Sequence, residues 1–356
     1  MNQSIINTKE SDHTKQPIFF GDGLGLQRYD TFRYKKYYDS FQNQLSAFWR
    51  PEEVDITNDA GQFKELPGQE KHIFTENLGF QTLLDSVQTR GIPNLLRNCS
   101  NLEFEACANA WMFFEQIHSY SYTYIIKNIY ANPTEVFDSF NNNKDIINRV
   151  SGVTKYYDNY IDSLGSSVDE QKEALYLTLV SINILEGIRF YVSFACSFAF
   201  AERGQMEGNA KIISLIQRDE QKHLAITQNT LNFLRKEASE GFQHIVKKCE
   251  PIVRKMYQDS ANEEIEWANH LFKNGGMLGL NAEILTEFMM WLTNKRMKAI
   301  GLEPLNDINK NPLNWMNSWM NSKAVQIAPQ ETEIESYNIG AIKQDASEAN
   351  LKEFVL

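Results

Sequence analysis

The chain is poor in the residues that build turn-rich folds, since its 356 residues include only 18 Gly and 9 Pro. Because β structure with many turns uses both freely, this scarcity favours long helices. Basic residues are also outnumbered: 35 Lys and Arg face 46 Asp and Glu, which leaves a net charge of −11. No Lys/Arg cluster stands out against that balance, and this argues against a nucleic-acid surface.

A long uninterrupted apolar run is missing as well. The most apolar stretch, Ser181 to Ala201, contains Glu186 and Arg189, and its uninterrupted part is too short to span a bilayer. The N-terminal residues are polar and lack the apolar core of a signal peptide. The 4 cysteines form no Cys-x-x-Cys pair. We therefore expect free thiols, a reducing cytoplasmic location and no membrane partner.

Apolar residues at helical spacing, by contrast, are abundant. They predict helices over residues 33–49, 71–88, 100–130, 145–164, 167–202, 209–236, 243–272 and 282–300. Two capping boxes, Ser100-Asn-Leu-Glu103 and Ser167-Val-Asp-Glu170, predict where two of these helices begin. Because no segment shows convincing strand alternation, the sequence predicts an all-α bundle. Residues 1–30 are expected to form a flexible arm, 31–325 the helical domain and 326–356 a flexible tail.

Two of the predicted helices contain a glutamate followed three residues later by a histidine. Glu115 and His118 form one pair, and Glu220 and His223 form the other, so each pair shares one helix face. In a helix bundle, a two-metal site uses two such pairs and one further carboxylate from each of two other helices. Spacing alone is weak evidence, because a third pair ending at His13 lies in a polar segment. The Glu115–His118 and Glu220–His223 pairs instead lie in long amphipathic helices. Charged groups on the apolar face of such a helix are buried, and buried charges must be paired or bound to metal.

Asp85 and Glu186 can supply the two further carboxylates. Each acid lies in an apolar segment that would otherwise be core, although an exposed or helix-end position remains an alternative for Asp85. Four carboxylates neutralise two divalent ions, and oxygen donors with two imidazoles suit iron or manganese. The predicted metal ligands are Asp85, Glu115, His118, Glu186, Glu220 and His223.

Tyr122 lies on the same helix face as the first pair, within one turn of His118. Its spacing leaves two interpretations equally open. A buried tyrosine usually satisfies its hydroxyl with a polar partner. Beside an oxygen-activating metal pair, it could instead lose an electron and a proton and persist as a radical. Three apolar residues on the ligand-bearing faces, Phe190, Phe194 and Ile216, are expected to wall the site.

The sequence resembles the small, radical-generating subunit of class Ia ribonucleotide reductase. The resemblance extends from about Ala47 to the last residue, and its most specific segments are Gln81–Ser86, Glu115–Tyr122, Asn183–Phe200 and Arg218–His223. It implies a ferritin-like helical homodimer in which the six predicted ligands bind two iron ions. Ferrous iron and O2 would then generate a stable tyrosyl radical at Tyr122. Ligand identity by itself does not exclude manganese.

The resemblance also implies roles for residues outside the predicted ligand set. Trp49 matches the tryptophan through which an outside electron enters, and Asp219 matches the aspartate that links it to a ligand histidine. The radical would pass through Tyr337 to a separate large subunit, which reduces ribonucleotides to deoxyribonucleotides for DNA synthesis. The C-terminal tail would dock on that subunit, with Phe354 and Leu356 as apolar anchors.

Two other functions use the same kind of scaffold. An oxygen-dependent hydroxylase or desaturase would need a substrate-sized pocket beside the metals. A ferritin-like iron-binding protein would need a cage-forming surface, and it would give no reason for Tyr337 or for apolar anchors in the tail.

Overall fold

The computed structural model describes residues 5–9 and 11–319, and this part of the chain contains no β-strand. The predicted all-α fold is confirmed. The bundle has these α-helices in chain order: α1 (Lys35–Leu45), α2 (Asp59–Glu65), α3 (Gly68–Gly91), α4 (Leu102–Ile129), α5 (Pro133–Asn142), α6 (Lys144–Ser163), α7 (Val168–Ile184), α8 (Tyr191–Ala201), α9 (Glu207–Lys236), α10 (Gln243–Leu271), α11 (Ala282–Ala299) and α12 (Met316–Trp319).

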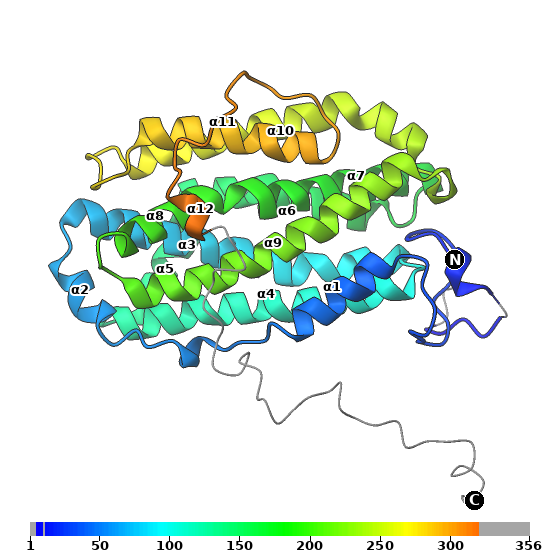
Figure 1. The fold of residues 1–356 in the computed structure, drawn as a ribbon, viewed down its shortest axis with the longest axis horizontal. Coiled ribbons are helices and arrows are strands. Elements are labelled where there is room, and N and C mark those ends of the chain that lie inside the picture. Colours follow the sequence, from blue (N-terminus) through cyan, green and yellow to red (C-terminus); the bar gives the residue numbers. More distant parts are fainter. Residues whose placement is uncertain (1–4, 10, 320–356) are drawn as a thin grey trace, which may run out of the picture.

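Four long helical rods form the centre of the molecule. Helix α3 packs on α4, α4 on α9, α9 on the α7–α8 rod, and α8 on α3, so the four close into a ring. Helices α10 and α11 cover the α7–α8 side, and α1 covers α4 on the opposite side (Figure 1). This ring with covering helices is the predicted ferritin-like bundle, and its interior is the core.

Helix α4 begins one residue later than its sequence pattern predicts. The N-cap is Asn101, whose side chain accepts a hydrogen bond from the backbone N–H of Phe104. Ser100 does not cap the helix, because its hydroxyl donates to the Pro17 carbonyl at 2.7 Å. The Glu103 carboxylate accepts from the backbone N–H of Arg33 at 2.6 Å. Both side chains of the supposed capping box therefore tie the N-terminal segment to α4.

The helix expected over residues 167–202 begins as predicted but is not continuous. Ser167 and Glu170 form the capping box that opens α7. A single π-helical segment, η4 (Leu185–Arg189), then separates α7 from α8. Glu186 lies within η4. Apolar periodicity cannot reveal such a segment, because a π-turn inserts one residue without changing the buried character of its neighbours.

The middle of the N-terminal segment is anchored to the bundle. Ile18 and Phe19 are fully buried. The Ile18 N–H donates to the Glu240 carboxylate at 2.8 Å, and Phe20 N–H donates to the Asn98 carbonyl at 2.9 Å. The sequence prediction of a flexible arm overlooked these anchors, because two apolar residues in a polar segment show no period. Residues 326–356 lie outside the described part of the chain.

The stretch Val168–Ala201 is long and apolar enough to cross a membrane by composition, but 94% of its most apolar window is buried inside the protein. It is therefore a core element of the bundle. All four cysteines are also buried, and all four are free thiols, as predicted. Burial raises the pKa of Cys99, Cys107 and Cys196 to about 12, so these thiols stay protonated near neutral pH.

Candidate metal centre

The structure brings the six predicted ligands together at the centre of the helical ring. Asp85 lies on α3, one Glu-x-x-His pair on α4, Glu186 on η4, and the second pair on α9. All six side chains are fully buried. The alternative of an exposed or helix-end position for Asp85 is therefore excluded.

The ligand atoms form two overlapping sets of four. Within each set, one atom from every residue lies within 4.8 Å of the others. Glu115 and Glu220 belong to both sets, so each could bridge two ions. Asp85 and His118 complete one set, and Glu186 and His223 complete the other.

Many polar atoms in this cluster have no hydrogen-bond partner. They include both oxygens of Asp85, Oε2 of Glu186 and Nε2 of His223, whereas His118 Nδ1 lies 3.1 Å from Glu220 Oε1. Buried polar groups are normally paired, and each unpaired one is costly. The donor set therefore fits a pair of divalent cations, which would satisfy these atoms together.

The charges of the cluster lead to the same conclusion. Burial, reinforced by the charges of Glu115 and Glu220, raises the pKa of Asp85 well above its usual value. Burial and the charge of Glu220 likewise raise the pKa of Glu186. Burial by itself lowers the pKa of His118, but the charge of Glu220, 3.1 Å from its Nδ1, and the hydrogen bonds with Asp219 and Glu115 together raise it well above its usual value. A cluster with more acids than histidines thus takes up protons unless cations replace them.

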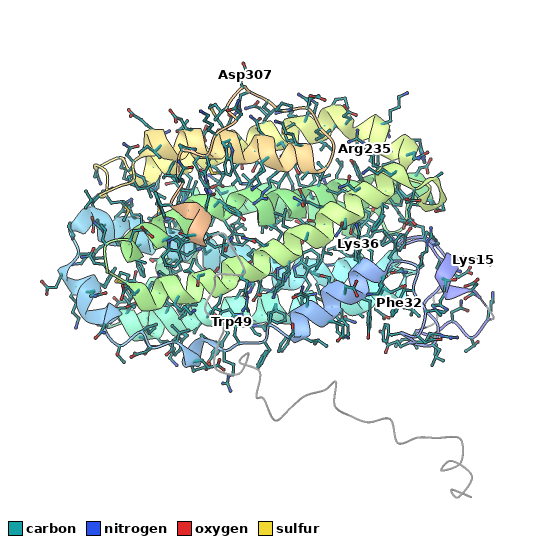
Figure 2. All side chains as sticks on the ribbon, in the orientation of Figure 1. Lys15, Phe32, Lys36, Trp49, Arg235 and Asp307 are labelled. Carbon is teal, nitrogen blue, oxygen red and sulfur yellow. The ribbon has the colours of Figure 1, made fainter. Side chains whose placement is uncertain are left out.

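A chain of hydrogen bonds leads from the cluster to Trp49. The indole Nε1 of Trp49 donates to Asp219 Oδ2 at 2.7 Å, and His118 Nε2 lies 3.4 Å from the same oxygen. Burial opposes ionisation of Asp219, but the bond with His118 and the charges of Lys222 and Arg218 lower its pKa. Figure 2 shows Trp49 on the α4 side of the bundle. The three residues that the resemblance linked are thus adjacent in space.

Tyr122 is fully buried, and Asp85 is the acid that acts most strongly on its hydroxyl. Burial, followed by the charges of Asp85 and Glu220, raises the pKa of Tyr122 well above the usual value. Its phenol is therefore protonated near neutral pH. Phe190, Phe194 and Ile216 are also fully buried, and the two phenylalanine rings stack at 5.5 Å.

Two residues that contact the ligands were not predicted from the sequence. Trp111 donates from Nε1 to Glu115 Oε1 at 2.7 Å, and its ring lies 5.3 Å from that of His223. Gln88 donates from Nε2 to Glu186 Oε1. Helical spacing could have indicated both residues, because side chains three or four positions apart share a helix face. Trp111 lies four residues before Glu115, and Gln88 lies three residues after Asp85.

Helix α11 supports the π-helical segment that presents Glu186. Arg296 donates from Nε to the Gly187 carbonyl at 3.0 Å and from its guanidinium to the Tyr191 hydroxyl at 2.9 Å. A Cβ at position 187 would lie 3.0 Å from Leu224 and 3.2 Å from Arg296. Glycine therefore allows the close approach of both neighbours to η4.

The third Glu-x-x-His spacing, which was not predicted to bind metal, lies apart from the cluster. His13 contacts the Thr31 hydroxyl at 3.0 Å in the N-terminal segment. Tyr337, Phe354 and Leu356 lie outside the described residues.

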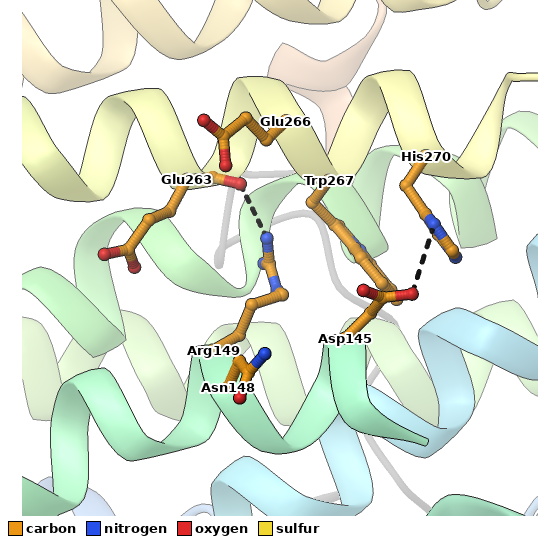
Figure 3. Close-up of a pocket in the computed structure, with 7 residues that line it drawn as sticks. All are labelled: Asp145, Asn148, Arg149, Glu263, Glu266, Trp267 and His270. Carbon is orange, nitrogen blue, oxygen red and sulfur yellow. Dashed lines mark hydrogen bonds and ion pairs between the residues drawn. The ribbon is translucent and has the colours of Figure 1, made fainter.

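A hollow of about 310 Å³ lies between α6 and α10, and none of its lining residues is a predicted ligand (Figure 3). Arg149 reaches from α6 to donate to the Glu263 carbonyl at 2.7 Å and to the Glu264 carboxylate. Its guanidinium also lies 4.5 Å from the Trp267 ring centre. Burial raises the pKa of Glu264 to about 7, against the charge of Arg149. This region braces α6 against α10 and is separate from the metal cluster.

Comparison with known proteins gives a consistent match. The family model described as "Ribonucleotide reductase, small chain" matches residues 27–312. The "Ribonucleoside-diphosphate reductase subunit beta" of Buchnera aphidicola subsp. Baizongia pistaciae is 45% identical over 377 aligned positions, which cover 100% of both chains.

Solved structures share the fold. The "Ribonucleotide reductase R2 subunit from Clostridium botulinum" matches with a TM-score of 0.81 and 28% identity over 90% of this chain and 98% of its own. The dimanganese(II)-NrdF of Streptococcus sanguinis matches with a TM-score of 0.68 and 20% identity, over 85% of this chain and 100% of its own.

The family match covers most of the chain, and the full-length relatives are named as subunits of an oxidoreductase. Members of this family work with a large subunit, and the small subunit implies a two-metal site, for which the clustered carboxylates and histidines are candidates. The chain belongs to the ribonucleotide reductase small-chain family, as the sequence resemblance predicted.

Proposed function

We propose that the chain binds two iron ions and uses them with O2 to generate a stable radical at Tyr122. The radical is then relayed to the large subunit for reduction of ribonucleoside diphosphates. The observation that supports this most directly is the pair of four-residue ligand sets that share Glu115 and Glu220. When bound, the metal pair supplies the electrons that reduce oxygen and the oxidising power to remove one from tyrosine.

In this proposal Tyr122 loses one electron and its hydroxyl proton. Asp85, the nearby acid with the largest effect on the phenol, is the group that can hold that proton. Full burial of Tyr122 and of the Phe190, Phe194 and Ile216 side chains keeps water from the radical. Their shared burial supports storage of a radical over binding of a substrate.

One electron, which neither the metals nor Tyr122 provide, would come from an external donor and enter through Trp49, and Asp219 would connect that indole to His118. The continuous contacts from the Trp49 indole through Asp219 to His118 support this role. Because Asp219 is held ionised by Lys222 and Arg218, it remains an acceptor for both the indole and the imidazole.

The metal pair is proposed to be iron, and the cell compartment to be the cytoplasm. The oxygen and imidazole donors would also accept manganese, and one structural relative is named as a dimanganese protein. The free, buried thiols are compatible with a reducing compartment.

We also propose that the chain forms a homodimer through the outer face of α4. Phe113 is 53% exposed and Tyr120 is 45% exposed on that helix, opposite the buried ligands. Phe48 stacks on Phe113 at 5.9 Å, and Leu45 adds a further exposed apolar side chain. An aromatic patch of this kind on a helix face is typical of an interface between subunits.

Metal binding is tested by loading the metal-free protein anaerobically with Fe2+ or Mn2+. We expect about two ions per chain for the wild type and at most about one for Glu186→Ala, because one ligand set loses a carboxylate. Metal content after desalting, measured by mass spectrometry, gives the stoichiometry. His13→Ala should keep the wild-type value, and retention of both ions by Glu186→Ala would contradict the assignment.

Radical formation is tested by adding ferrous iron and O2 and recording the electron paramagnetic resonance spectrum. We expect a tyrosyl signal in the wild type and none in Tyr122→Phe, which keeps the ring but removes the proton and the oxidisable phenol. Tyr37→Phe is the matched control, because Tyr37 is equally buried with its hydroxyl 2.8 Å from Thr230. A signal that survives in Tyr122→Phe would rule out this residue as the radical site.

The tail is tested by removing all residues after Gln326. We expect the radical to form normally, because every ligand and Tyr122 remain, while reductase activity with the large subunit falls to background. Tyr337→Phe should keep binding of the large subunit, measured by surface plasmon resonance, and lose turnover. Activity of the truncated chain at the wild-type level would disprove docking through the tail.

The homodimer is tested by sedimentation of the full chain. Phe113→Asp should shift the protein from dimer to monomer, because it buries a charge in the proposed interface. Leu278→Asp, at a residue that is 76% exposed in the segment after α10, is the control and should remain dimeric. A dimer that tolerates Phe113→Asp would exclude this face.

A further inference from the structure

The carboxylate of Glu186 is held on one side only. Its Oε1 accepts a hydrogen bond from Gln88 Nε2, whereas no amide or other N–H donor of the described residues faces its Oε2, which lies among the other acids of the cluster. Both side chains are fully buried, so water does not compete for either oxygen. The two oxygens of this ligand are therefore chemically different before any metal binds.

The amide of Gln88 is itself fixed by Tyr157. The Tyr157 hydroxyl donates to Gln88 Oε1 at 2.6 Å, which leaves the amide NH2 facing Glu186. A reversed amide would point its carbonyl at the carboxylate, and two acceptors would then face each other without a proton. Tyr157 thus determines the orientation of Gln88.

The backbone is shaped to admit Tyr157 at this position. A Cβ on Gly91 would lie 2.3 Å from Tyr157 Cζ, so only glycine lets the ring rest against α3. Asp85 and Gln88 lie three residues apart on that same helix. Helix α3 therefore provides a ligand for one metal set and, through Gln88, orients a ligand of the other.

We propose that Gln88 and Tyr157 are a positioning pair that makes Glu186 bind its metal through Oε2 alone. This inference rests on the proposed two-metal centre and adds which oxygen of Glu186 is used and what selects it. Occupation of Oε1 by the amide disfavours bidentate binding, because the second oxygen would have to give up its buried donor. Without the pair, no hydrogen bond distinguishes the two oxygens of Glu186.

The test combines two variants with two matched controls. Gln88→Met removes the amide and nearly preserves volume, and Tyr157→Phe removes only the hydroxyl. Tyr160→Phe removes a buried hydroxyl from the same helix, where it bonds to Asn98, and Gln44→Met removes a buried amide on α1. Circular dichroism and melting curves verify that each variant is folded. If Gln88→Met does not fold, Tyr157→Phe still decides the question.

Mn2+ titration of the metal-free proteins, followed by electron paramagnetic resonance, measures binding without enzyme activity. We expect Gln88→Met to weaken one of the two ions by about tenfold or more and Tyr157→Phe to weaken the same ion less. Both controls should bind as the wild type does. Wild-type binding by both variants would overturn the positioning role while leaving the two-metal centre intact. Failure of the wild type to bind two ions would instead overturn the proposed function.

A crystal structure of the Mn2+-loaded wild type gives the direct answer. Glu186 should coordinate through Oε2 with Gln88 still bonded to Oε1. Bidentate coordination by Glu186 in that crystal would disprove the inference, whatever the titrations give.

Discussion

Four carboxylates enclosed in an apolar core are the constraint on which the rest of the structure depends. Like charges at this separation repel strongly where water is excluded, and two histidines do not balance them. The acids stay close together because the packing of the surrounding helices fixes their positions. Bound cations would offset the repulsion between the carboxylates, so the unpaired polar atoms of the cluster support the proposed binding of two metal ions.

Four elements of the helical ring are enough to bring the six candidate ligands together. Two Glu-x-x-His pairs on α4 and α9 each present two donors from one turn, and α3 and η4 add one carboxylate each. The neighbouring polar side chains then make the donors unequal. Trp111 engages Glu115, Gln88 engages Glu186, and Asp219 engages His118, so each of these ligands has a fixed partner on its far side.

Features that repeat along the chain could be predicted from the sequence, whereas features that depend on a single residue could not. Long amphipathic helices repeat their pattern over many residues, so α3, α4, α9 and α10 were predicted within a few residues of their ends. Single-residue effects were less visible. Asn101 caps α4 because the hydroxyl of Ser100 is engaged by Pro17, a partner remote in sequence. The short helix α5 was missed because its apolar pattern is brief.

The sequence by itself determined the all-α class, the family and the six acids and histidines of the cluster, because helical spacing and local motifs are properties of neighbouring residues. Only the tertiary structure decided which acids are shared between the two ligand sets, and that Asp85 is buried. It alone revealed the π-helical segment beneath Glu186 and the partners Trp111, Gln88 and Tyr157. The physical reason is that these features depend on contacts between helices far apart in the chain, which no local pattern encodes.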